Sequence, residues 1–289
     1  MFGGYWAFLP ALLGRVFNTP VFIILGGTDC VSFPALNYGN LRKPLLRTVI
    51  GWSYSLSSKL IPVDDSLVKQ HYSYSHRYPY PEQGFMSFFP NLKTPHHVIY
   101  NGFDSNQFIS PKEPKELNSF ICVASVDSIM RYTLKGIDLI VELANTFKQC
   151  KFKVIGVSDE LNKRVNPNLE NLEFISFIDQ TALVSYLQDS EFYLQLSISE
   201  GFPNALCEAM LCGCIPIGSG VGAIPKIIGE TGFVISSDKI MELCDTFQRI
   251  LSLSSEERLE KGAGARQRII TEFDIKKRES EFFQLVEHG

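Results

Sequence analysis

Short apolar runs alternate with longer amphipathic stretches along most of this chain. The runs are rich in β-branched residues, which is typical of buried strands, and the stretches between them have the period of helices. The expected strands lie at 21–26, 59–63, 96–100, 120–125, 152–157, 173–178, 192–197, 214–219 and 233–236. Strands that alternate with helices predict an α/β protein with parallel sheets, right-handed crossovers and helices on both faces.

The first part of the chain is less regular than the rest. Its helical stretches are expected at 5–17, 41–57 and 65–75. The stretch 5–17 is strongly apolar, but Pro10 interrupts it and it is shorter than the roughly 20 residues that a membrane span requires. We therefore predict that 5–17 is a buried helix of a globular domain.

A charged connector with two prolines, 110–118, separates the irregular part from the regular part. We expect one domain over 1–104 and a second over 105–272, each a Rossmann-like α/β unit. Ligands of such sheets bind at the carboxyl ends of the strands, so the expected site is a cleft between the two domains. A final helix, 273–289, is expected to pack back on the first domain.

Charge and cysteine content exclude some classes of function. The chain has 27 basic and 31 acidic side chains and a net charge of −4, without a block of lysine or arginine, which argues against nucleic acid as a partner. Its seven cysteines are odd in number and have no C-x-x-C spacing. This usage favours a reducing, cytoplasmic compartment, and peripheral association with the inner face of a membrane stays open.

The segment SEGFPNALCEAMLCG, residues 199–213, carries the clearest chemistry. It follows an expected strand and places Glu200 before, and Glu208 within, a helix that begins near Pro203. The N–H groups at such a helix start bind anions, and carboxylates accept hydrogen bonds from paired hydroxyls. A sugar nucleotide has hydroxyls on both sides of a diphosphate and matches this order. The alternative for either glutamate alone is that it offsets the helix dipole.

Three segments resemble the retaining GT-B glycosyltransferases of family 4. They are SISEGFPNALCEAMLCGCIPIGSGVGAIPKIIGETGFVI (197–235), with the Glu-x7-Glu signature, VIYNGFD (98–104) and FICVASVDSIMRYTLKGIDLIVELA (120–144). The resemblance implies a GT-B fold, made of two Rossmann-like domains with a cleft between them. It also implies transfer of a sugar, with retention, from a UDP- or GDP-sugar to a glycan or lipid-linked acceptor, with no cofactor and no metal.

The same resemblance assigns roles to individual residues. It implies that Glu208 binds the ribose hydroxyls and Glu200 the hydroxyls of the transferred sugar. Lys135 and Arg131 would stabilise the leaving diphosphate, although the family commonly has Gly-Arg-Leu after the strand, which this chain lacks. For Lys135 alone, the alternative is a solvated surface lysine. The residues expected to line the sugar and diphosphate are Gly201, Phe202, Pro203, Asn204 and Ala205.

Metal chemistry has no candidate ligand set in the sequence. No Asp-x-Asp pair occurs, and Cys207, Cys212 and Cys214 lack the spacing and the histidine partners of a zinc site. We therefore interpret these three cysteines as core residues and expect no metal.

One departure from the family concerns the first domain. Fewer strands are predicted before residue 104 than the N-terminal domain of a GT-B glycosyltransferase usually contains. We therefore expect a truncated N-terminal domain that a partner chain or a missing N-terminal segment completes. The alternative function is a noncatalytic, truncated nucleotide-binding relative that supports a partner transferase. A sugar-nucleotide epimerase is a third hypothesis, which the Glu-x7-Glu string disfavours.

Overall fold

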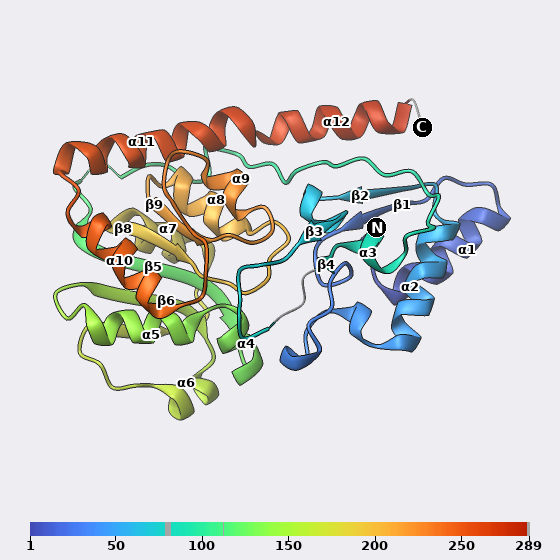
Figure 1. The fold of residues 1–289 in the computed structure, drawn as a ribbon. Helices are drawn as coiled ribbons and strands as arrows, with labels where there is room; N and C mark the ends of the chain where they lie inside the picture. The colour runs from blue at the N-terminus through green and yellow to red at the C-terminus, as the bar shows by residue number, and fades with distance from the viewer. Residues whose placement is uncertain (79–81, 112, 288–289) are drawn as a thin grey trace. The chain divides into compact units, whose positions relative to one another are not determined.

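The computed structural model describes residues 1–78, 82–111 and 113–287. These residues form two compact units, and each is described by itself (Figure 1). The first unit contains the described parts of Met1–Asn101, Glu200–Phe202 and Arg278–Gly289, and the second contains those of Gly102–Ser199 and Pro203–Lys277. None of the described helices is long and apolar enough to cross a lipid bilayer.

The second unit is built on a six-stranded sheet in which all neighbouring strands are parallel. Its strands are β5 (Glu116–Val126), β6 (Lys151–Val157), β7 (Leu172–Ile175), β8 (Ser190–Gln195), β9 (Ile215–Ser219) and β10 (Phe233–Ile235). Their order is β10-β9-β8-β5-β6-β7, so the direction of winding reverses between β5 and β8. This is the doubly wound order of a Rossmann-like domain, and it confirms the predicted parallel sheet.

Helices on both faces of this sheet shield its apolar strands from water, and Figure 1 shows α5 and α8 on opposite faces. The helices are α4 (Ile129–Leu134), α5 (Ile137–Thr146), α6 (Asp159–Val165), α7 (Gln180–Asp189), α8 (Asn204–Leu211), α9 (Ile224–Ile228), α10 (Ile240–Leu251) and α11 (Ser255–Glu272). At the centre of the core, the Phe120 ring stacks on Phe152 and Phe192, with ring centroids 5.1 and 4.8 Å apart. Stacked aromatic rings in this core fix the packing of three adjacent strands.

The first unit contains a smaller set of parallel strands. Strand β1 (Phe22–Leu25) pairs with β2 (Lys59–Pro62), and Phe2 forms a parallel bridge to Ile24 on the other side of β1. The segment predicted as a strand at 96–100 lies along β2, where the Ile99 N–H donates to the Pro62 carbonyl at 3.0 Å. The other elements are η1 (Tyr5–Ala7), α1 (Phe8–Val16), η2 (Pro34–Leu36), η3 (Asn40–Arg42), α2 (Pro44–Leu56), η4 (Asp65–Leu67), β3 (Gln70–His71), β4 (Glu82–Gln83) and α3 (Phe85–Phe88).

The last helix, α12 (Ile275–Glu287), brings the end of the chain to the first unit. Leu285 lies in one apolar cluster with Ile61 and Ile99, and Phe282 packs against that cluster. The last two residues of the helix expected over 273–289 lie outside the described part of the chain.

Two sequence predictions in the first unit are wrong. The helix expected over 65–75 is a single 3-10 turn followed by β3, and Tyr72 and Tyr74 are both buried. Residues two apart lie on different sides of a helix, and the non-helical backbone after β3 lets both rings lie inside the unit. The helix predicted over 5–17 does form, as η1 and α1, but most of its large side chains are exposed rather than buried.

Candidate functional site

The candidate site lies where the winding of the second sheet reverses, at the carboxyl ends of β5 and β8. The segments that follow these two strands contact each other there, because the Ile198 N–H donates to the Leu134 carbonyl at 2.8 Å. Gly136 has φ +68°, and a Cβ at this position would lie 2.1 Å from the Leu196 carbonyl oxygen. Only glycine fits both the backbone conformation and this close approach. The fold thus holds Lys135, between Leu134 and Gly136, beside the loop that leads to Glu200.

The two basic side chains expected at the site both follow β5. Lys135 is the C-terminal cap of α4 and is half-buried, and its N–H donates to the Arg131 carbonyl at 2.9 Å. Arg131 is half-exposed and lies 3.5 Å from the Asp127 carboxylate, and its guanidinium also donates to the Ser125 carbonyl at 3.4 Å. The structure therefore brings both cations to one edge of the sheet, with Arg131 paired to a neighbouring acid.

The loop after β8 and helix α8 carry the other expected residues. Gly201, Phe202 and Pro203 are buried, Ala205 is half-buried, and Asn204 is exposed at the start of the helix. Pro203, the residue before α8, provides no side-chain cap.

Glu200–Phe202 belong to the first unit. A Cβ at Gly201 would lie 2.2 Å from the Gly26 carbonyl oxygen, and the Phe202 ring lies 6.2 Å from that of Tyr100. Gly201 is thus required for the close approach of two backbone segments. Glu200 itself is half-buried.

Glu208 lies on α8 and is half-buried. Burial raises the pKa of its carboxyl group, and no other cause contributes to that shift. Within the described part of the chain, its carboxylate has neither a hydrogen bond nor an ion pair. An ionised carboxylate that is partly buried without a partner raises the free energy of the folded protein. Such a carboxylate is well suited to accept hydrogen bonds from a ligand.

A buried polar network under the loop was not predicted from the sequence. The Tyr193 hydroxyl donates to Gln195 Oε1 at 3.2 Å, Gln195 Nε2 donates to Ser197 Oγ at 2.9 Å, and Ser219 Oγ donates to the Ser197 carbonyl at 2.6 Å. The network ties β8 and β9 to the start of the loop. Its only signal in the sequence is Gln195, a polar residue within the apolar run at 192–196.

The cysteines of the second unit behave as core residues. Cys207, Cys212 and Cys214 are buried, and burial is the main reason that the pKa of Cys212 rises to about 12. Cys214 Sγ donates to the Leu187 carbonyl at 3.1 Å. Over residues 1–78, 82–111 and 113–287, no cluster of three or more histidine, cysteine or acidic side chains could hold a metal ion.

Solved structures with the same architecture are glycosyltransferases. HepE from Anabaena in complex with UDP-glucose is 15% identical and has a TM-score of 0.73, with 98% of this chain and 76% of that chain covered. Sucrose-phosphate synthase from Thermosynechococcus elongatus is 16% identical and has a TM-score of 0.72, with 97% of this chain and 71% of that chain covered. At these identities the likeness concerns the fold, which is the α/β GT-B fold of glycosyltransferases.

Sequence comparison points to the same class. Residues 119–253 match the family model described as "Glycosyl transferases group 1". One of the subunits of the human phosphatidylinositol N-acetylglucosaminyltransferase is 23% identical over 164 residues, which are 53% of this chain and 33% of that protein. The chain is thus similar to about a third of this curated relative, and the matched family segment contains most of the second unit and its site.

Proposed function

We propose that this chain is a hexosyl-type glycosyltransferase that acts, with retention and without a metal, on a nucleotide-diphosphate sugar and a glycan or lipid-linked acceptor. One observation carries the proposal. The strand order brings the segment with Lys135 against the loop that leads into α8, the helix on which Glu208 has no partner among the described residues. A doubly wound sheet binds ligands at this position.

The diphosphate of the donor binds at the start of α8. The N–H groups near Asn204 and Ala205 and the positive end of the helix dipole favour an anion there. Lys135 and Arg131 stabilise the negative charge that develops on the diphosphate as the glycosidic bond breaks. Preorganised cations and N–H groups supply this stabilisation without a metal ion.

The two carboxylates bind the two ends of the donor. Glu208 accepts hydrogen bonds from the ribose hydroxyls, which removes the penalty of its unpaired burial. Glu200 accepts hydrogen bonds from the transferred sugar, and the backbone of Gly201, Phe202 and Pro203 lines the sugar and diphosphate. We also propose that the first unit provides the acceptor-binding side.

The similar proteins support particular substrates and a location. HepE was solved with UDP-glucose, which favours a UDP-sugar over a GDP-sugar as the first donor to test. The human relative is named for N-acetylglucosamine transfer to phosphatidylinositol and is one subunit of its enzyme. Its name favours a lipid-linked acceptor, a partner chain and a site of action at a membrane. We also propose a cytoplasmic location.

Donor binding and transfer are tested separately. Thermal shift with UDP, GDP and their sugars identifies the donor, and release of the nucleoside diphosphate together with a labelled glycosylated acceptor establishes transfer. We expect activity to be the same in EDTA as in its absence. Activity that EDTA abolishes and Mg²⁺ or Mn²⁺ restores contradicts the metal-free mechanism. Nucleotide binding without transfer, with or without a partner chain, would indicate the noncatalytic alternative.

A further inference from the structure

Helix α1 of the first unit is packed with its small residues inward. Ala11 and Gly14 are buried, as is Ala7 directly before the helix, and a Cβ at Gly14 would lie 2.3 Å from the Val21 side chain. The large apolar residues lie on the opposite side, where Leu9 is 59% exposed. A helix of a soluble domain normally buries its large apolar stripe, so this exposed stripe requires an explanation.

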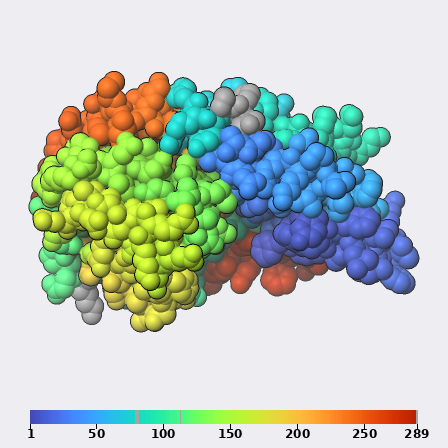
Figure 2. Space-filling view, turned by 90° about the horizontal axis from the view of Figure 1, so that it is seen from below, coloured from blue at the N-terminus to red at the C-terminus, as the bar shows by residue number. Residues whose placement is uncertain are grey.

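The neighbouring helix α2, which contacts α1, also exposes large apolar side chains. The Phe8 ring of α1 lies 6.0 Å from the Trp52 ring of α2, and the N-terminal segment and α2 are side by side in Figures 1 and 2. We call this area the α1–α2 surface. Its exposed members include Trp6, Leu9, Leu13, Phe17, Leu45 and Trp52. Exposed apolar residues gathered on two helices that pack together mark interaction sites.

The segment of the sequence that carries this surface differs in net charge from the rest of the chain. The acidic side chain in residues 1–63 is Asp29, which is buried. The basic side chains in the same range are Arg15, Arg42, Lys43, Arg47 and Lys59. Residues 1–63 therefore carry +4, and because the whole chain carries −4, residues 64–289 carry −8. The α1–α2 surface belongs to a basic segment of an acidic protein.

We propose that the α1–α2 surface binds the surface of an anionic lipid bilayer. An apolar helical face with aromatic residues and nearby basic side chains is the arrangement of a helix that lies in the membrane interface. Both tryptophans of the chain, Trp6 and Trp52, are on this surface, and tryptophan is enriched at membrane–water interfaces. Arg15 lies on α1 and Lys43 caps the start of α2; both are exposed and form no ion pair with the described residues.

Charge favours a lipid surface over a second copy of the chain. A symmetric dimer through this surface would place the same basic segments of two copies against each other. An anionic bilayer instead attracts each lysine or arginine near it by roughly 1 kcal/mol, which corresponds to about a five-fold factor in affinity. The proposal depends on the surface of the first unit alone and does not require the proposed sugar transfer.

The test uses the purified chain and vesicles of phosphatidylcholine with or without phosphatidylglycerol. Because both tryptophans lie on the α1–α2 surface, we expect their fluorescence to shift to the blue when anionic vesicles are added. Co-sedimentation should follow the same titration and weaken as salt is raised, since salt screens the attraction of the basic side chains. Neutral vesicles should bind at least about ten-fold more weakly, as expected for two or more basic contacts.

Matched variants locate the binding surface. Leu9→Glu with Leu13→Glu places charge on the α1–α2 surface and should reduce vesicle affinity on the order of ten-fold or more. Arg15→Glu with Lys43→Glu should reduce affinity for anionic vesicles while neutral vesicles are unaffected. The controls are Phe177→Glu and Met241→Glu, which alter similarly exposed apolar residues of the second unit and should bind like the wild type. Circular dichroism verifies that each variant is folded.

Several results would overturn the proposal. One is the absence of binding to anionic vesicles by the folded wild-type protein, and another is equal loss of binding in the control variants. Equal affinity for neutral vesicles would refute the role of the basic side chains. Light scattering that shows a dimer, which Leu9→Glu with Leu13→Glu dissociates, without vesicle binding would instead assign this surface to a second copy of the chain.

Discussion

The substitution Glu208→Gln should have opposite effects on ligand binding and on protein stability. In the protein without ligand, the Glu208 carboxylate is half-buried, its pKa is raised by burial, and no described residue hydrogen-bonds to it. If the donor's ribose hydroxyls bind there, they provide the missing partners. Glutamine keeps the shape of the side chain and removes its charge.

The loss in binding follows from the kind of hydrogen bond that is removed. Hydrogen bonds to a charged group contribute about 1.5–3 kcal/mol, more than bonds between neutral groups. We expect Glu208→Gln to weaken the binding of the nucleoside diphosphate by roughly 10- to 150-fold at neutral pH, at about 1.4 kcal/mol for each factor of ten. For the wild type, affinity should also decrease as the pH falls through the raised pKa of Glu208, because the protonated carboxyl loses this bonding.

The effect on stability has the opposite sign. A carboxyl whose pKa is higher in the folded state than in the unfolded state binds protons more tightly when folded, so the ionised form opposes folding. The wild type therefore loses stability as the pH rises from the ordinary pKa of glutamate through the raised pKa of Glu208. Removing the charge should stabilise the protein at pH 7 by about 1 kcal/mol, the lower end of the penalty for an unpaired buried group. Below pH 4 the two proteins should be equally stable.

Calorimetric titration and urea denaturation, both over a range of pH, measure the two effects. A control, Glu230→Gln, changes a glutamate that follows α9 and is not a candidate ligand of the donor. Unchanged nucleotide affinity in Glu208→Gln would refute the assignment to the ribose. Lower stability of this variant at pH 7 would refute the argument that the carboxylate is unpaired in the protein without ligand.

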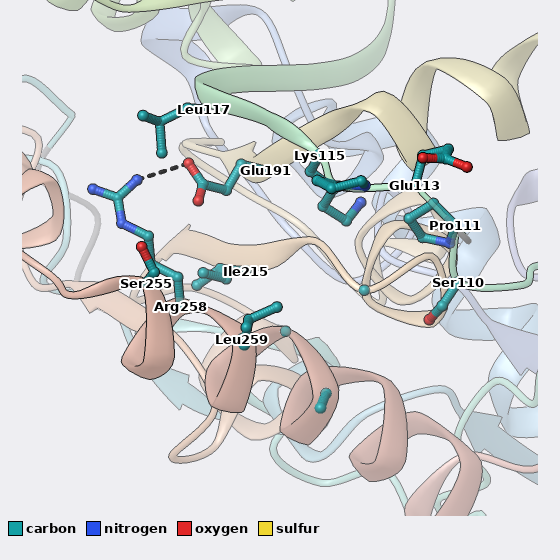
Figure 3. Close-up of a pocket in the computed structure, with 14 residues that line it drawn as sticks. Ser110, Pro111, Glu113, Lys115, Leu117, Glu191, Ile215, Ser255, Arg258 and Leu259 are labelled. Atoms are coloured by element: carbon teal, nitrogen blue, oxygen red, sulfur yellow. Dashed lines mark hydrogen bonds and ion pairs between the residues drawn. The ribbon is translucent and has the colours of Figure 1, made fainter.

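Two further predictions concern basic residues of the second unit. Lys135→Ala should lower kcat by something like 100-fold in a transfer assay, because one charge-stabilising group is lost, and normal turnover would remove Lys135 from the mechanism. Arg258→Met leaves Glu191 buried without the guanidinium that now lies 2.8 Å away, so urea denaturation should show a loss of about 3–5 kcal/mol. This pair lies in a cavity of about 570 Å³ between α11 and the start of β5 (Figure 3), and Arg258→Met with Glu191→Gln should regain part of the loss.

The secondary structure of the second unit was largely predictable from sequence because its signals are local. The apolar runs at 120–125 and 192–197 became β5 and β8, because buried parallel strands have no polar face and read as continuous apolar segments. Helix α8 begins at Asn204, as the turn residues before it predict. The same approach was wrong over 65–75, where the chain is not helical and both Tyr72 and Tyr74 are buried, an outcome of tertiary packing that local helical preference does not indicate.

Sequence by itself determined that the chain is α/β, which segments form the strands of the second sheet, and that the Glu-x7-Glu string follows one of them. Only the tertiary structure decided that β5 and β8 are neighbours, because strand pairing joins segments far apart in the chain. That pairing brings the Lys135 segment to the loop before α8. It also decided which side of α1 is exposed, because the close fit at Gly14, and not the hydrophobicity of Leu9 and Leu13, sets the inward side.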